Sequence, residues 1–522
     1  MKGRRAAFLV ISALVIALAA FWRFHHLTLK PFHHDEGVNW YFLDKWFTEG
    51  VYAYDPTNFH GPLLYEIAYL PARFIGQGEA VLRAMPALMG LAAIAFLLGM
   101  RRWIGARGAL IVGALLAIAP VDVYFSRTFI HEAYLVASLM MAADFLLRYL
   151  ESLRVRDLFG LLAAVVFAFC FKETAGIATA SAAAAYLLAT YVGGAKETQT
   201  APEGETGIPV TEDFPDPPFG WPVARMNAKP ILLLDAVAVA LTIWILSFTT
   251  FMTNPHGIVD FFVAFVPWLK TGAGGDSGHE KEFVYFFQLM GKFYWPLLVL
   301  AVFALKDVVV RRRRVAIFFF AWFALQLLIY SLIPYKTPWC VMTIAAPLAP
   351  LAALGATRAA AWLGRRSWRP APVGAAALAV FGAVMFARSS WDVNFVRYDD
   401  DRIEIVYVQT RRAYMEIFPK VRTVADRVAG SDTEVMMVDA ASPTKYYMRD
   451  YLGKMRNYAD IPAERIDLPI VLVSEAKLAL LRELLLETYV ESRYPIWPGQ
   501  TIVLLLRADL WPESGSDGTK VE

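Results

Sequence analysis

The chain has 522 residues, 57% of them hydrophobic, and its mean hydropathy is +0.44. Soluble proteins carry about 45–50% apolar residues, so this composition excludes an ordinary soluble enzyme and indicates a protein with several membrane spans. The formal net charge of +3 gives no sign of a nucleic-acid partner. Cys170 and Cys340 both fall within apolar runs, so no disulfide framework is expected.

Eleven apolar segments predict transmembrane helices, because each approaches or reaches the roughly 18–20 residues that cross a bilayer. No small-residue cleavage pattern follows the first segment, so we expect it to persist as a helix. In chain order the segments are at about residues 6–24, 82–100, 108–123, 132–149, 158–170, 174–192, 230–250, 285–305, 315–333, 338–357 and 371–388.

Lys and Arg are concentrated at one predicted side of the membrane. They occur in the N-terminal MKGRR and in the connections at 101–107, 148–157, 193–229, 306–314 and 358–369. The positive-inside rule places these segments in the cytoplasm. We therefore expect a polytopic α-helical membrane protein with a cytoplasmic N-terminus and an external C-terminus. The connection at about 193–229 is rich in Pro, Glu and Thr, which predicts a disordered cytoplasmic loop.

The character of the sequence changes near residue 390. Short β-type runs alternate with helical patterns, which predicts a small α/β domain outside the membrane. We therefore expect a transmembrane domain over residues 1–390 and an extracytoplasmic α/β domain over 391–522. The β-type runs are 434–439, 468–474 and 501–507, and the helical patterns are 412–429, 442–452 and 475–490.

Histidines mark the predicted outer face. All eight fall on that side: His25, His26, His33, His34, His60, His131, His256 and His279. Several acidic residues accompany them where apolar spans begin or end. Ionisable groups at such depths are costly and tend to be functional. The working face is therefore expected to be external, with a site assembled from several loops.

The segment HHDEGVNWYFLDKWF, residues 33–47, follows the first span. Asp35 and Glu36 are adjacent, so on a helix they point about 100° apart. One could face a reacting group while the other holds a metal ion, a helix end or a cation. The alternative is a helix cap combined with an interfacial anchor, since Trp40 and later aromatic residues share one helical face.

Two further motifs lie near the outer ends of spans. NFHGPLLYE places His60 at a Gly-Pro turn, where it could also be a surface histidine. YFSRTFIHEAYL places Arg127 and His131 four residues apart, so on a helix they would share one face, followed directly by Glu132. Arg127 could equally be an interfacial anchor.

The remaining motifs carry isolated cations or acids. FKET places Lys172 and Glu173 between two apolar spans, where the two could pair with each other. IPYKTPWC places Lys336 between two prolines, where a snorkelling side chain is the ordinary interpretation. TNPHG adds His256 in an outer loop.

In their order and content these motifs resemble the membrane glycosyltransferases of the GT-C fold, in particular the protein O-mannosyltransferase and aminoarabinose-transferase branch (glycosyltransferase 39-like). The matching motifs are HHDEG in the first outer loop, HGPLLYE before the second span, FSRTFIHEAYL at the fourth span and YKTPW before a late span. The resemblance covers roughly residues 1–390 and looks closest to a prokaryotic flippase-activity-associated subgroup. The C-terminal domain is similar only in position.

The resemblance implies transfer of a sugar from a polyprenyl-phosphate donor to a protein or lipid acceptor, outside the cell (inner) membrane and with inversion. It implies that Asp35 is the general base and that Glu36 or His60 orients the acceptor. It further implies donor-phosphate contacts from Arg127, Lys172 and Lys336, and a substrate-binding site that also includes His131, Glu132, Glu173 and His256.

A divalent ion is a further implication, since some relatives in the fold use one. His33, His34 and Glu36, near other His and acidic residues, offer the mixed nitrogen and oxygen ligands that suit Zn²⁺, Mn²⁺ or Mg²⁺. The alternative function is a lipid-linked sugar flippase, or a flippase-associated protein, without transferase chemistry. The near absence of charge inside the predicted spans argues against a flippase.

Overall fold

The computed structural model describes residues 2–194, 216–220, 230–274, 279–364, 370–440, 442–511 and 519–521. Contacts divide the chain into two compact units. The first contains Met1–Leu27 and Trp46–Val396, and the second contains Thr28–Lys45 and Arg397–Glu522. The expected domain boundary near residue 390 lies close to the division at Val396. The Thr28–Lys45 segment, however, groups with the C-terminal residues instead of the transmembrane domain.

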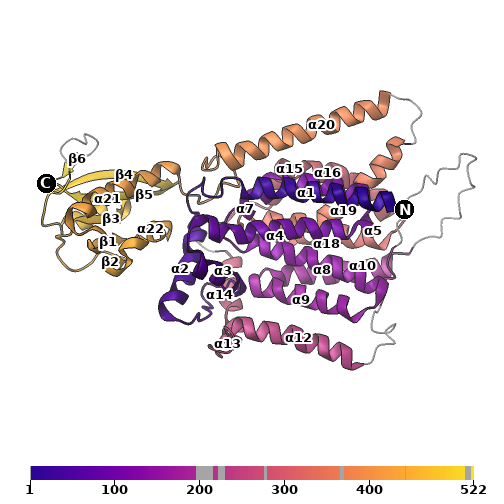
Figure 1. The fold of residues 1–522 in the computed structure, drawn as a ribbon, viewed down its shortest axis with the longest axis horizontal. Coiled ribbons are helices and arrows are strands. Elements are labelled where there is room, and N and C mark those ends of the chain that lie inside the picture. Colours follow the sequence, from indigo (N-terminus) through magenta and orange to yellow (C-terminus); the bar gives the residue numbers. More distant parts are fainter. Residues whose placement is uncertain are drawn as a thin grey trace, which may run out of the picture. The chain divides into compact units, whose positions relative to one another are not determined.

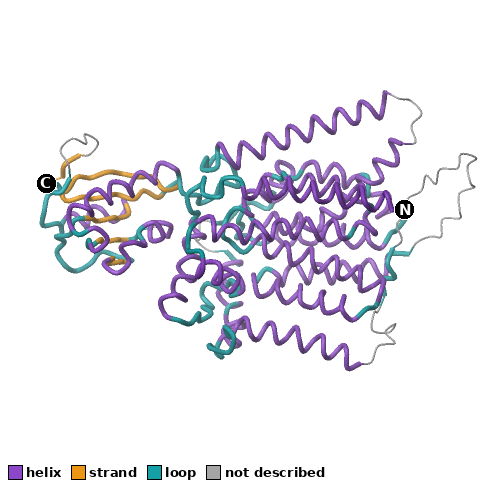
Figure 2. Tube along the Cα trace, in the orientation of Figure 1, coloured by secondary structure: helices purple, strands orange, loops and turns teal. Residues whose placement is uncertain are grey.

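Helices make up the first unit in its described part (Figures 1 and 2). The long ones are α1 (Lys2–Phe24), α4 (Glu79–Gly99), α8 (Glu132–Ser152), α9 (Val155–Phe171), α10 (Ala175–Val192), α12 (Pro230–Phe248), α18 (Arg314–Leu332), α19 (Cys340–Gly364) and α20 (Pro370–Trp391). Shorter helices connect them: α3 (Leu63–Phe74), α5 (Arg101–Ile104), α6 (Ala106–Ala117), α7 (Pro120–Ser126), α13 (Gly257–Val263), α14 (Phe265–Gly272), α15 (Tyr285–Phe293), α16 (Trp295–Val302) and α17 (Leu305–Val309).

Seven of the described helices are long and apolar enough to cross a membrane alone, and two bent pairs raise the number to nine. The pairs are α6 with α7, bent by 60°, and α15 with α16, bent by 87°. A proline occupies the first turn of each second helix, Pro120 and Pro296, where it removes a backbone donor from the break. The predicted segments 158–170 and 230–250 form α9 and α12, which are not among the nine. Eleven spans are therefore not confirmed.

Small residues allow α19 to lie at the centre of the first unit. Every residue from Cys340 to Thr357 is buried. A Cβ on Gly108 would lie 1.8 Å from the carbonyl oxygen of Ala353 in α19. Gly355, within α19, approaches the backbone of Leu300 equally closely. Membrane helices pack through such close backbone approaches, because lipid supplies no hydrophobic drive between them.

The expected disordered loop is partly ordered. Residues 216–220 are described and packed against the first unit: the carboxylate of Asp216 accepts a hydrogen bond from the backbone N–H of Arg314 at 2.8 Å. The ring of Phe219 stacks on Tyr186 with centroids 5.3 Å apart. The expectation of disorder is therefore wrong for this stretch, because it carries an aromatic anchor. Residues 195–215 and 221–229 lie outside the described part of the chain.

The C-terminal part of the second unit is built around a six-stranded sheet, which confirms the predicted small α/β domain (Figure 1). The strands follow the order β2-β1-β3-β5-β4-β6, with β1 parallel to β2 and β3 and the other pairs antiparallel. The elements are α21 (Ile417–Val428), β1 (Val435–Val438), α22 (Ser442–Tyr447), β2 (Met455–Tyr458), β3 (Ile470–Ser474), α23 (Glu475–Arg482), β4 (Tyr489–Trp497), β5 (Gln500–Arg507) and β6 (Thr519–Val521).

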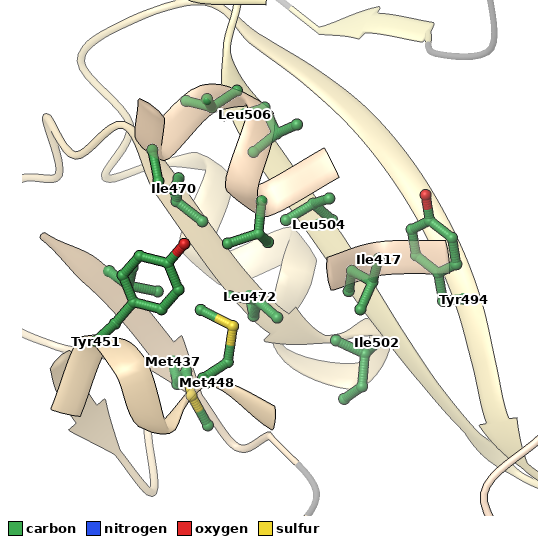
Figure 3. Close-up of a cluster of buried hydrophobic side chains, with 14 of the residues drawn as sticks. Ile417, Met437, Met448, Tyr451, Ile470, Leu472, Tyr494, Ile502, Leu504 and Leu506 are labelled. Carbon is green, nitrogen blue, oxygen red and sulfur yellow. The ribbon is translucent and has the colours of Figure 1, made fainter. Parts of the chain in front are cut away.

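Apolar side chains cover both faces of this sheet, which explains why β1, β3 and β5 read as continuous apolar runs. On one face Ile470, Leu472 and Leu504 pack with α21 (Figure 3). On the other, Val471 and Val473 pack with α23. The predicted helix over 475–490 is too long: it ends at Arg482, because the chain from Tyr489 pairs with β5 as β4.

Candidate active site

Two ion pairs lie together in the first unit, where predicted motifs meet at helix ends. The ammonium of Lys172 donates to Glu132, and both side chains are buried, with 5% and 2% exposed. Nδ1 of His60 lies 2.9 Å from a carboxylate oxygen of Glu173, whose side chain is 6% exposed, whereas that of His60 is 28% exposed. Glu132 begins α8, Lys172 and Glu173 follow α9, and His60 precedes α3. Packing of α8 against α9 therefore assembles the cluster.

Lys172 and Glu173 do not pair with each other, contrary to one sequence interpretation. Lys172 ends α9 with extended backbone angles, φ −154° and ψ 139°. Successive side chains of an extended backbone point in opposite directions. Lys172 therefore meets Glu132 while Glu173 meets His60.

Gly61 brings His60 to this position. Its backbone N–H donates to the carbonyl of Phe171 at 3.1 Å. A Cβ at Gly61 would lie only 2.0 Å from the carbonyl oxygen of Cys170. The turn therefore needs glycine to lie against the end of α9, which sets His60 beside Glu173.

The pairing opposes the effect of burial on the pKa values of Lys172 and Glu173. Burial alone would lower the pKa of Lys172, but the Glu132 carboxylate raises the pKa above its usual value. Burial alone would raise the pKa of Glu173, but the interaction with His60 outweighs burial and lowers the pKa. Burial raises the pKa of Glu132, and the neighbouring Lys172 opposes that rise.

His131 adds an uncharged imidazole beside His60. The two rings lie 4.7 Å apart between centroids. Burial lowers the pKa of His131 well below its usual value, and the nearby His60 and Lys172 lower this pKa further. Its Nε2 atom is buried and has no hydrogen-bond partner in the described part of the chain. This nitrogen is therefore an unsatisfied polar atom beside the cluster.

An aromatic hollow adjoins Glu173. The rings that line it come from the loop before α3, from α9, from α12 and from the helices after α12. A charged pair beside an aromatic surface can take a molecule with one polar and one apolar end. The lining rings are Tyr54, Phe59, Phe169, Phe248, Phe261 and Phe265.

Arg127 has a different environment from the one expected. α7 ends at Ser126 and α8 begins at Glu132, so Arg127 and His131 lie in a connecting turn and not on one helical face. The guanidinium of Arg127 donates to the carbonyls of Trp22 at 3.2 Å and His26 at 2.7 Å. It also lies 4.3 Å from the ring centroid of Phe395. Arg127 therefore anchors the end of α1.

Lys336 and His256 are also held by other groups. The ammonium of Lys336 donates to the carbonyls of Lys281 at 3.0 Å and Ile333 at 2.5 Å. The His256 side chain is 72% exposed and lies 3.0 Å from Asp260, one helical turn away. Neither residue contacts the two ion pairs through these atoms.

In the second unit, the HHDEG motif begins helix α2 (His34–Glu49) with a reciprocal cap. The backbone N–H of His33 donates to Glu36 at 2.9 Å, and the backbone N–H of Asp35 donates to Nδ1 of His33 at 3.0 Å. This is the capping-box arrangement, which satisfies free donors at a helix start. The cap interpretation therefore holds for Glu36, and a catalytic role for this residue stays a prediction. The Asp35 carboxylate is partly exposed and has no hydrogen-bond partner in the described residues.

The predicted metal ligands do not fit a metal site. Nε2 of His33 donates to the carbonyl of Tyr407 at 2.6 Å, so both ring nitrogens of His33 are already used. Burial lowers the pKa of His33, which agrees with a neutral ring that donates from one nitrogen and accepts at the other. The ring of His34 packs edge-on against Trp497. Within the described ranges, no group of three or more His, Cys, Asp or Glu side chains is arranged to hold a metal ion.

Sequence reasoning missed a buried polar cluster inside the spans. Arg23, near the end of α1, donates to the carbonyls of Ala117 at 3.0 Å and Leu116 at 3.1 Å. The hydroxyl of Tyr294 donates to Asp122 at 2.7 Å, and Asp122 also interacts electrostatically with Arg23. The signal available in the sequence was an arginine within the last turn of an apolar helix.

Comparison with known proteins supports the resemblance. Residues 59–200 match the family described as dolichyl-phosphate-mannose-protein mannosyltransferase, and this range contains both ion pairs. Crystal structures of ArnT from Cupriavidus metallidurans, bound to undecaprenyl phosphate and in the apo state, match with TM-scores of 0.63 and 0.62 and 16% identity. Both comparisons cover 98% of this chain and 99% of ArnT.

A crystal structure of the Archaeoglobus fulgidus oligosaccharyltransferase, tethered with an acceptor peptide, matches with a TM-score of 0.50 and 10% identity, over 99% of this chain and 76% of that one. No significant match was found among curated proteins. The apolar helices and this fold make the protein an integral membrane protein. The chain therefore has the fold of ArnT over nearly its whole length, and residues 59–200 match the mannosyltransferase family.

Proposed function

We propose that this protein is a membrane glycosyltransferase that moves a sugar from a polyprenyl-phosphate-linked donor to an acceptor. The observation that carries the proposal is the coincidence of fold and site: the ArnT fold extends over nearly the whole chain, and the matched family range contains the two ion pairs. The undecaprenyl phosphate bound to ArnT supports a lipid-linked donor. The peptide tethered to the oligosaccharyltransferase supports a peptide acceptor, and a lipid acceptor is the alternative.

The donor would bind at the two ion pairs. In this proposal the lipid tail packs in the aromatic hollow beside Glu173, while the phosphate approaches His60, the most exposed member of the cluster. Nε2 of His131 would contact the phosphate or the sugar. Arg127 and Lys336 would have to give up backbone hydrogen bonds to reach a phosphate, so we assign them supporting roles.

We assign acceptor activation to Asp35. Its carboxylate has no partner among the described residues, whereas Glu36 and His33 are occupied in capping α2. A single displacement at the anomeric carbon would invert its configuration.

The distribution of Lys and Arg supports an orientation. Arg101, Arg102, Arg154 and Arg156 lie at the end of the bundle that carries the N-terminus, opposite to the two ion pairs. The positive-inside rule then puts the N-terminus in the cytoplasm and the cluster outside the cell membrane. In this proposal α9 and α12 also cross, which gives eleven spans and an external C-terminal unit.

Sugar release from a panel of polyprenyl-phosphate sugars by the purified chain tests the proposal. Asp35→Asn should abolish turnover while donor binding persists, and Glu173→Gln should weaken donor binding. Asp44→Asn, on the same helix α2, is the matched control and should retain activity. Loss of turnover on chelation would show a metal held by residues other than His33. Transbilayer movement of the donor without sugar release by the wild-type chain would favour the flippase alternative and refute the transferase.

A further inference from the structure

An arginine-lined cleft lies at the end of the bundle that carries the N-terminus, away from the candidate active site. It forms where α4 ends and α5 begins, and where α8 passes into α9. It encloses about 1580 Å³, counting the solvent at its mouth. This volume accommodates a group the size of a lipid headgroup. The lining cations are Arg101, Arg102, Arg148, Arg154 and Arg156.

Positive charge exceeds negative charge in this cleft. Two carboxylates, Glu151 and Asp157, line it together with the five arginines. Arg102 pairs with Glu151, Arg148 pairs with the buried Asp144 at 2.8 Å, and Arg156 lies 3.8 Å from Asp157. The side chain of Arg154 is exposed and has no ion pair in the described part of the chain. The cleft therefore retains an uncompensated positive charge.

Arginines elsewhere at the same end of the bundle contact two carboxylates that do not line the cleft. Asp307 is fully buried and accepts hydrogen bonds from both Arg311 and Arg358, each at 2.7 Å. Asp216 accepts from Arg313 and from the backbone of Arg314. A positive-inside signal requires only charge, so it does not explain why five arginines line one hollow.

Trp103 provides a second, independent observation. Its side chain lines the cleft and the residue is 4% exposed, yet its indole N–H is buried without a hydrogen-bond partner in the described ranges. An indole N–H and guanidinium groups are donors only. A ligand that satisfies them must bring acceptor oxygens, and a phosphate does so with the geometry that arginine prefers.

We infer that this cleft binds the phosphate-bearing headgroup of an anionic phospholipid. The cleft lies at the ends of α4 and α8, two helices long and apolar enough to span a membrane, and so at the depth of lipid headgroups. Basic pockets between transmembrane helices bind such headgroups. The site is independent of the proposed sugar transfer and would hold the lipid as a structural ligand.

Lipid binding to the full chain in detergent, measured by native mass spectrometry, tests the inference. The probes are phosphatidylglycerol, phosphatidylcholine and inorganic phosphate. Arg154→Gln/Arg156→Gln removes two cleft cations, and Arg5→Gln/Arg107→Gln removes two exposed arginines that do not line the cleft. The cleft variant should bind phosphatidylglycerol roughly 10- to 30-fold more weakly than wild type, and the control variant less than about threefold.

Several outcomes would overturn the inference. Equal losses in the two double variants would show general surface electrostatics, and no loss in the cleft variant would exclude the site. Phosphatidylcholine binding as tightly as phosphatidylglycerol would also exclude a site for an anionic headgroup. Displacement of the lipid by inorganic phosphate at low millimolar concentration would show a site for small anions instead of a lipid. If the arginine variant does not fold, Trp103→Phe, which keeps the packing and removes the N–H, should weaken binding roughly threefold to tenfold. Unchanged binding in Trp103→Phe would then refute the inference.

Discussion

Separating the buried ion pair between Lys172 and Glu132 should strongly destabilise the protein. Their side chains are 5% and 2% exposed, so neither charge can recover its hydration when the partner is removed. Breaking such a pair costs about 3–5 kcal/mol. Lys172→Met leaves the Glu132 carboxylate buried alone, and Glu132→Gln leaves the ammonium alone. Each single variant should lose about that much free energy of unfolding.

The double variant Lys172→Met/Glu132→Gln removes both charges of this pair and should recover much of the loss, with a coupling energy of about 2–3 kcal/mol. Lys270→Met, at an exposed lysine, is the control and should change stability by less than about 0.5 kcal/mol.

The chain provides its own reporter of unfolding. Cys170 and Cys340 are free and buried, so a thiol-reactive fluorophore should label them only when the protein opens. Because the sulfur of Cys340 lies 4.0 Å from Glu132, the measurement is best made in a Cys340→Ala background, with Cys170 as the reporter. Single-variant losses below about 1 kcal/mol, or strictly additive losses, would refute the description of this pair as buried and coupled.

Three further changes test other parts of the same region. Gly61→Ala should destabilise the protein and lower donor turnover, because the new Cβ would clash with the backbone at Cys170. Gly176→Ala is the control and should be tolerated, because its new Cβ would have only Phe169 nearby, at 3.9 Å. The unfolding temperature and the activity of both variants test this prediction. Burial lowers the pKa of His131, so below about pH 6.5 the unfolded chain binds a proton that the folded chain does not; the unfolding temperature should fall from pH 7.5 to 5.5, and less so in His131→Gln. Burial raises the pKa of Glu66 to about 8, so wild-type stability should fall as the pH rises from 5 to 8, and Glu66→Gln should remove that part of the dependence. A parallel pH dependence in variant and wild type would contradict either assignment.

Hydropathy and local periodicity determined most of the elements. Each of the eleven apolar segments became a helix or a bent pair, because length and composition of a segment are enough to specify a helix in lipid. The three apolar runs near the C-terminus became β1, β3 and β5 for the same local reason. The edge strand β2 and the inner strand β4 escaped prediction, because their partly exposed sequences lack a continuous apolar run.

The partners of the charged residues were decided only by the tertiary structure. The sequence gathers ionisable residues into motifs at span ends, but it left Lys172 facing either Glu173 or another residue, and it left Glu36 as either a catalytic acid or a cap. The structure pairs Lys172 with Glu132, forty residues away, and uses Glu36 to cap its own helix. Hydropathy is a property of neighbouring residues, whereas an ion pair depends on which helix ends meet after packing. The motifs therefore indicate where chemistry is concentrated, and the folded chain decides which groups remain free to perform it.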